Sequence, residues 1–169
     1  SSQAVSTLGG NIAENSGGPH TLKMGVTAQH ILGVTFVEDS GKVVTIGGGV
    51  RNPPWPDFSQ LVIGSEGTLG LVSEAVCNLA PSPLVIQTAL AAFKTVSDAT
   101  GCVSEIIATG LLPAAMEIMD AQILVALKAA FGLEFPDGTA ALLLVECDGD
   151  QEAVVEAEVK AVAQAAQTH

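Results

Sequence analysis

The sequence predicts an α+β chain in two parts, and three observations support that prediction. Most glycines lie before residue 71, among runs rich in Val, Ile and Thr that favour strands. The second half is rich in alanine and alternates apolar extended runs with segments of helical periodicity. The segment "APSP", residues 80–83, sets two prolines between extended runs. We therefore expect one domain over residues 1–80 and another over 84–169.

In the first part, the clearest predicted element is a β-hairpin within residues 33–48. Two β-branched runs flank Asp39, Ser40 and Gly41, a turn trio whose glycine can take a positive φ. The runs "QLVIG" (60–64) and "GLVSEAVCNL" (70–79) are expected to be further strands, separated by the loop "GSEGTLG". We expect this part to be built from antiparallel strands.

In the second part, strands and helices are expected to alternate. The expected strands are 84–93, 113–120 and 140–148, and the expected helices are 95–108, 121–132 and 151–166. Gly132 closes the second of these helices, and Asp150 fits the N-cap of the third. Three β-α pairs of this length predict a small layered α/β unit.

Charge and cysteine content exclude several classes of protein. Lys and Arg number 6 against 18 Asp and Glu, for a net charge of −12, which disfavours binding to nucleic acids or anionic membranes. Cys77, Cys102 and Cys147 are far apart and odd in number, so we expect free thiols in a reducing, cytoplasmic compartment. The chain opens without Met or a visible signal peptide, and we expect a fragment of a longer protein.

Two glycine-rich segments are the candidate ligand-binding features. In "GSEGTLG", residues 64–70, backbone N–H groups can approach a ligand or form an anion-binding nest. The loop lacks the Gly-Lys-Ser/Thr end of a P-loop and does not match GxGxxG, and a tight turn between strands is an equal alternative. In "STLGGNIAENSGGPHTLKMGVT", residues 6–27, two Gly pairs enclose small polar residues, and Lys23 lies beside them as a cation suited to an anionic ligand. Here the alternative is a polar surface loop.

Taken together, these segments resemble a known flavoprotein family. "TLGGNIAENSGGPHTLKMGVT" and "IGSEGTLGLVSEAVCNLAP" are similar to segments of the FAD-binding subunit of bacterial glycolate oxidase and of FAD-linked D-lactate dehydrogenases. These belong to the vanillyl-alcohol-oxidase-type flavoproteins, which have a PCMH-type FAD-binding domain. The resemblance implies that residues 1–80 are part of that domain. It implies that residues 84–169 are part of the cap (substrate) domain, with ferredoxin-like β-α units.

The resemblance also implies a set of FAD contacts. Backbone N–H groups would meet flavin or phosphate oxygens, Leu71 and Val72 would cover an aromatic ring, and Glu66 would accept a ribose or loop hydrogen bond. The implied contact residues are Gly9, Gly10, Asn11, Ala13, Ser16, Gly17, Gly64, Ser65, Glu66, Gly67, Thr68, Gly70, Leu71 and Val72. No residue of the chain is assigned a catalytic role, and no metal site is expected.

The activity implied by the resemblance is oxidation of a small 2-hydroxy acid, glycolate or D-lactate, by hydride transfer to flavin. The implied partners are an iron-sulfur subunit and a second flavin-type subunit, which would place a cytoplasmic protein at the periphery of the inner membrane. A homodimer is an alternative assembly. The alternative function is a non-catalytic α/β fragment that folds or dimerises without binding cofactor.

The sequence departs from the family pattern in two ways. The upstream glycine-rich loop that cradles the FAD pyrophosphate and the downstream histidine-rich region of the cap domain are not in this sequence, so we expect weak FAD binding and no activity from the chain alone. Asp57 matches the family's Gly-Tyr-Asp-Leu, but Pro56 stands where the Tyr is expected. The proline run at residues 53–56 is expected to re-route that loop.

Overall fold

The computed structural model describes residues 4–50, 54 and 56–169. The chain divides into two compact units. The first contains the described residues up to Gly18 and those from Gly25 to Pro81, and the second contains residues 19–24 and 82–169. The sequence pattern does not reveal that residues 19–24 belong to the second unit.

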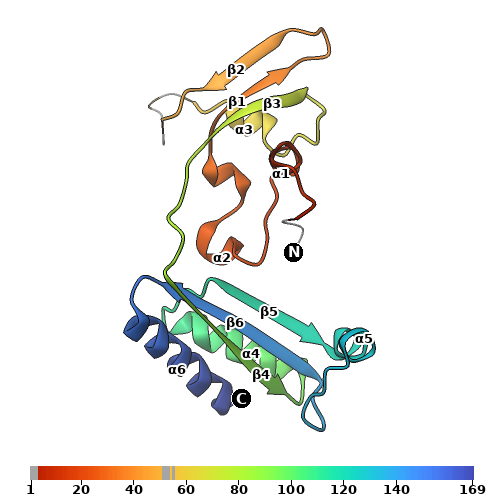
Figure 1. Ribbon diagram of the computed structural model, residues 1–169, viewed down its shortest axis with the longest axis vertical. Helices are drawn as coiled ribbons and strands as arrows, with labels where there is room; N and C mark the ends of the chain where they lie inside the picture. Colours follow the sequence, from red (N-terminus) through yellow and green to blue (C-terminus); the bar gives the residue numbers. More distant parts are fainter. Residues whose placement is uncertain (1–3, 51–53, 55) are drawn as a thin grey trace. The chain divides into compact units, whose positions relative to one another are not determined.

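The first unit is built on a three-stranded antiparallel sheet (Figure 1). Its strands are β1 (Ile31–Val37), β2 (Val43–Gly47) and β3 (Leu71–Cys77), in the order β2-β1-β3. The predicted hairpin is confirmed: β1 pairs with β2 from Gly33↔Gly47 to Val37↔Val43. At its turn, Gly41 has φ 80° and its N–H donates to the Glu38 carbonyl at 3.0 Å.

Short helices surround this sheet where the sequence predicted none. They are α1 (Leu8–Glu14), α3 (Ser59–Val62) and the 3-10 helix η1 (Thr27–His30). The predicted strand over residues 60–64 is therefore wrong: Asp57 Oδ1 accepts from the Ser59 N–H (3.0 Å) and its hydroxyl (2.5 Å), which starts a helical turn. An apolar run of three residues has no period long enough to distinguish a strand from a helix.

The second unit confirms the predicted alternation of strands and helices. Its elements are β4 (Val85–Phe93), α4 (Val96–Ala108), β5 (Ala115–Asp120), α5 (Ala121–Phe131), β6 (Ala141–Gly149) and α6 (Glu152–Thr168). The strands form an antiparallel sheet in the order β4-β6-β5 (Figure 1). Residues 19–24, which include the short helix α2 (Thr21–Met24), belong to this unit.

Helix capping follows the prediction at the end of α5 and differs from it at the start of α6. Gly132 closes α5 in the left-handed conformation (φ 65°), as expected. Asp150 does not cap α6, because β6 runs on to Gly149 and the N-cap position falls on Gln151, whose side chain makes no capping hydrogen bond. No helix among the described residues has the length and apolar character needed to span a bilayer.

Each unit has its own hydrophobic core. In the first, Ile12 of α1 and Val62 of α3 pack with Val34 and Phe36 of β1. In the second, α4 and α6 cover one face of the sheet, burying Ile106, Val155 and Val162 against β4 and β6. Cys102 and Cys147 are free thiols inside this second core, and burial raises the pKa of both. Their burial is consistent with structural roles.

Candidate functional site

The two glycine-rich segments lie against each other in the first unit. The Gly64 N–H donates to the Ile12 carbonyl and the Glu66 N–H donates to the Ala13 carbonyl, each at 2.9 Å. Helix α1 also contacts β3, the strand that follows the second segment. Main-chain hydrogen bonds therefore hold these two segments, which are far apart in the sequence, side by side.

Helix α1 positions the first segment. The Thr7 hydroxyl accepts from the Gly10 N–H at 3.0 Å, and Asn15 ends the helix in the left-handed conformation (φ 50°). The Asn15 side chain then accepts from the Ala28 N–H at 2.9 Å, and the fully buried Ile12 anchors the helix in the core. The expectation of a loop here is wrong because a capping Thr and a left-handed Asn offset the low helix propensity of two glycines.

The second segment is a loop with unusual backbone angles. Gly67 has φ 77°, and Glu66, which is not glycine, has φ 53°. A left-handed residue with a Cβ costs on the order of 1 kcal/mol, and here the Glu66 N–H is held by the Ala13 carbonyl. At Gly70 an added Cβ would lie 2.5 Å from the Val37 carbonyl oxygen, so bare main chain is required for packing. At Gly67 an added Cβ would meet no protein atom within 4 Å.

A pocket of about 390 Å³ lies where these two segments meet. This volume is within the range of about 300–1,000 Å³ common for small-molecule sites. Residues predicted from the sequence make up most of its lining: Gly9, Gly10, Ala13, Ser65, Glu66, Gly67, Gly70, Leu71 and Val72. The structure thus brings together the two segments that the sequence pairs only by resemblance.

Five predicted residues lie in the two segments but do not line the pocket. These are Asn11, Ser16, Gly17, Gly64 and Thr68. Ser16 receives a hydrogen bond at its carbonyl from the Thr27 hydroxyl (2.8 Å), and the Thr68 hydroxyl donates to the Ser65 carbonyl (2.6 Å). Their contacts are within the protein, so they hold the main chain in place.

The implied set of FAD contacts omits three residues of the lining, Thr7, Glu14 and Val62, although Glu14 is one of the polar residues between the two Gly pairs. The signal that would have found Glu14 is helical spacing. It lies four residues after Gly10, just as Ala13 follows Gly9, so all four share one face of α1. The assumption of a loop concealed this periodicity.

The pocket lining includes acidic residues, and several of its N–H groups are already hydrogen-bonded. Among the described residues, the lining contains Glu14 and Glu66 and no Lys, Arg or His. The expectation that the loop's N–H groups meet flavin or phosphate oxygens stays a prediction, and most of these groups donate to protein carbonyls in the structure. Besides Gly64 and Glu66, Ser65 N donates to Val62 O (3.1 Å), Thr68 N to Ser65 O (2.9 Å) and Gly70 N to Gly67 O (3.3 Å).

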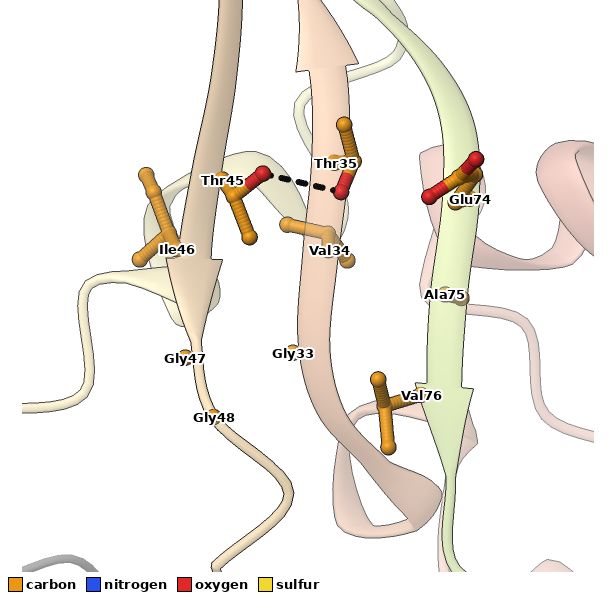
Figure 2. A pocket seen from close by; sticks show the side chains of 10 residues that line it. All are labelled: Gly33, Val34, Thr35, Thr45, Ile46, Gly47, Gly48, Glu74, Ala75 and Val76. Atoms are coloured by element: carbon orange, nitrogen blue, oxygen red, sulfur yellow. Dashed lines mark hydrogen bonds between the residues drawn. The ribbon is translucent and has the colours of Figure 1, made fainter.

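Two smaller hollows lie on the same unit. One of about 120 Å³ adjoins the first, sharing Gly9 and Val72 in its lining. Another, of about 160 Å³, lies on the sheet where Gly33 and Gly47 pair, beside the Thr35–Thr45 hydroxyl hydrogen bond of 3.1 Å (Figure 2). No residue predicted to contact a cofactor lines the pocket in Figure 2.

Lys23 is engaged inside the second unit. Its Nζ pairs with the Asp148 carboxylate and donates to the Asp148 carbonyl at 3.0 Å, while His20 Nε2 lies 2.9 Å from Glu146 Oε1. Both acids belong to β6, so residues 19–24 bind the β6 side of the second sheet. The expectation that Lys23 serves an anionic ligand is replaced by this pairing.

Asp57, the residue that matches the family pattern before the second segment, starts α3. The hydrogen bond from the Ser59 hydroxyl is the main cause that lowers the pKa of Asp57. Partial burial opposes this effect, and the Gln60 side chain and Ser59 N–H add to it. Two residues of the proline run 53–56, Pro53 and Trp55, lie outside the described residues. The predicted re-routing of that loop therefore stays a prediction.

Comparisons with known proteins point to FAD-linked proteins in both parts of the chain. The model of the FAD-linked oxidase C-terminal domain matches residues 82–169, and the model of an FAD-binding domain matches residues 1–47. The glycolate oxidase subunit GlcD of Bacillus subtilis (strain 168) is 39% identical over 155 residues, which cover 91% of this chain and 33% of that protein. The GlcD subunit of Escherichia coli (strain K12) is 37% identical, with coverage of 92% and 31%.

More distant matches agree with these. A D-lactate dehydrogenase of Anaerostipes hadrus is 29% identical, with 91% of this chain and 34% of that protein covered. A solved structure of an alkyldihydroxyacetonephosphate synthase superposes with a TM-score of 0.75 at 22% identity, covering 96% of this chain and 32% of that one. This likeness confirms the α+β fold. The chain spans about a third of the length of the curated relatives it matches.

Proposed function

The chain belongs to the FAD-linked oxidases, and we propose that it supplies part of the FAD site and part of the cap domain of a 2-hydroxy-acid oxidoreductase. The observation that carries the proposal is the pocket between α1 and residues 64–70, because it forms where two separate motifs of the family meet. On this proposal residues 1–80 belong to the FAD-binding domain and residues 84–169 to the cap domain.

The residues present fit a flat, partly apolar cofactor. Glycines at positions 9, 10 and 67 leave main chain uncovered, and the aliphatic side chains of Leu71 and Val72 offer a surface for an aromatic ring. FAD, when bound, supplies the capacity to accept a hydride from the substrate. The part played by this chain is to orient the cofactor against α1 and β3 and to exclude water from that side.

The proposed substrate is a small 2-hydroxy acid. Relatives that align with nearly the whole chain are named glycolate oxidase subunits and D-lactate dehydrogenase, and glycolate and lactate share the 2-hydroxy-carboxylate group. Because GlcD is named as a subunit, we further propose assembly with an iron-sulfur subunit and a second flavin-type subunit. Such a complex would be cytoplasmic and peripheral at the inner membrane. A homodimer is the alternative assembly.

An NMR titration of the 169-residue chain with FAD tests the proposed site. FAD should shift amide resonances of residues 7–14 and 64–72 ahead of others, even if binding is weak. Gly67→Val should abolish these shifts because a branched side chain would enter the pocket. The matched control is Gly41→Val, which changes a glycine of similar φ (80°) and equally open surroundings at the hairpin turn.

Two results would reject the proposal. One is an FAD titration that shifts no residue of either segment, which would favour a fragment that folds or dimerises without cofactor. The other is a folded Gly67→Val variant that responds to FAD as the Gly41→Val control does. Substrate choice is tested on the longer enzyme by asking whether glycolate or D-lactate bleaches the flavin under anaerobic conditions.

A further inference from the structure

We propose that the loop of residues 17–26 couples the second unit to the cofactor pocket of the first, with Lys23 as its positioning residue. The attachment of Lys23 to β6 steadies the end of α1 and thereby raises the affinity of the pocket for FAD. This role rests on the proposed function, namely that the pocket between α1 and residues 64–70 holds FAD. Lys23 itself does not line that pocket, so its effect on the cofactor is indirect.

The base of the loop is closed by hydrogen bonds within the first unit. The Thr27 N–H (3.1 Å) and the Thr27 hydroxyl (2.8 Å) both donate to the Ser16 carbonyl. Beside this pair, the Ala28 N–H donates to Asn15 Oδ1 at 2.9 Å. The two ends of the loop are therefore held together, which is the arrangement of an Ω-loop.

The tip of the loop, residues 19–24, belongs to the second unit. Lys23 Nζ pairs with the Asp148 carboxylate and donates to the Asp148 carbonyl at 3.0 Å. A second attachment joins His20 Nε2 to Glu146 Oε1 at 2.9 Å. The two side chains of the lysine pair are 31% and 17% exposed, against 59% and 24% in the histidine pair. Because a less exposed pair is screened less by water and salt, we expect Lys23 to carry most of the attachment.

The closed base of the loop continues directly into the pocket lining. Asn15 is the C-cap of α1, and its N–H donates to the Ile12 carbonyl at 3.2 Å. The same Ile12 carbonyl accepts from the Gly64 N–H at 2.9 Å. Ala13, which lines the pocket, accepts from the Glu66 N–H at 2.9 Å. The last turn of α1 is therefore hydrogen-bonded both to the loop base and to the second segment of the lining.

Two states of the loop tip account for the coupling. While Lys23 is paired with Asp148, the tip is docked on β6, and the loop base is restrained by the chain that enters and leaves the tip. When the pair is broken, the tip leaves β6 and the last turn of α1 opens more often. FAD then binds better to the docked state, by a factor that is set by the free energy of coupling between docking and binding.

The first test compares two lysine variants of the 169-residue chain. Lys23→Met should raise the dissociation constant for FAD about fivefold. It should also speed hydrogen exchange of the amides of residues 11–16 about fivefold, while the hairpin amides of residues 33–47 exchange as in the parent. Lys42→Met is the matched control, because it removes the same charge from an exposed lysine at the hairpin turn of the first unit.

Reciprocity distinguishes this coupling from a merely structural role. If docking favours FAD, FAD must favour docking by the same factor. Bound FAD should therefore slow hydrogen exchange of the Met24 amide, which donates to the His20 carbonyl in the loop tip and lies outside the pocket lining. This slowing should be absent in Lys23→Met. Lys23→Arg, which restores a long cationic donor, should recover most of the affinity for FAD.

The acid of the pair provides a second, independent variant. Asp148→Asn keeps the shape of the side chain and should weaken FAD binding as Lys23→Met does, so it serves as the test if the lysine variant does not fold. The double variant should bind FAD no more weakly than either single one, because both remove the same pair. Asp150→Asn is the control, since it replaces an exposed aspartate just beyond the end of β6.

The coupling and the proposed function fail in different ways. If FAD shifts the pocket amides but Lys23→Met binds it as Lys42→Met does, the coupling is disproved and the proposed function stands. The same holds if the hairpin amides exchange faster along with those of α1, if FAD leaves Met24 exchange unchanged, or if the two single changes are additive. If FAD shifts no residue of either lining segment, both are overturned.

Discussion

Replacing Gly9 by alanine should separate folding from cofactor binding, because the two effects have opposite signs. Gly9 is the second residue of α1 and has helical backbone angles, so alanine should raise helix stability by about 0.5 kcal/mol. The added Cβ would meet only the Val72 carbonyl oxygen, at 3.9 Å, which is ordinary van der Waals contact. The protein should therefore fold at least as well as before.

The same methyl group would enter the pocket, whose lining includes Gly9. Crowding a packed contact by one methyl costs about 1–3 kcal/mol, so FAD affinity should fall about tenfold. Stability is measured by urea unfolding, and affinity by NMR or flavin fluorescence titration. Gly18→Ala is the control, because an added Cβ there meets nothing within 4 Å and Gly18 does not line the pocket. A Gly9→Ala variant that is as stable as the parent and binds FAD equally well would refute the assignment of this surface.

Three further predictions concern the framework. Gly70→Ala should destabilise the first unit by about 2 kcal/mol or more in urea unfolding, because its Cβ would lie 2.5 Å from the Val37 carbonyl oxygen; an unchanged midpoint would contradict this. Lys23→Met should lower the free energy of unfolding by about 1 kcal/mol and should increase the hydrogen exchange of β6 amides. Lys42→Met, which replaces an exposed lysine, should have neither effect. Because the folded-state pKa of Asp57 is lowered, its contribution to stability is present above its ordinary value of 3.8 and is lost as pH falls through the lower folded value. Asp57→Asn should reduce the fall in the free energy of unfolding at acid pH. An unchanged dependence of that free energy on pH would show that another group is responsible.

Local signals account for the parts of the fold that were predicted correctly. The hairpin around Gly41 and the helix ended by Gly132 each depend on a glycine whose left-handed geometry is set within a few residues. The long strand β6 and the helix α6 have enough residues for their periods to be distinct. Where an element is short, as in α1 and α3, composition misled: two glycines suggested a loop, and a three-residue apolar run suggested a strand.

The sequence by itself determined the α+β alternation and the family, and hence FAD as the cofactor. Each of these depends on the order of residues within short stretches of the chain. Only the tertiary structure decided that Gly64 and Glu66 donate to the carbonyls of α1, and that Lys23 pairs with Asp148, 125 positions away. Because main-chain carbonyl groups are chemically alike at every residue, the sequence does not indicate which carbonyl will accept a hydrogen bond from a distant N–H group. The pocket with acidic residues in its lining, where several N–H groups are already hydrogen-bonded, is therefore a property of the folded chain.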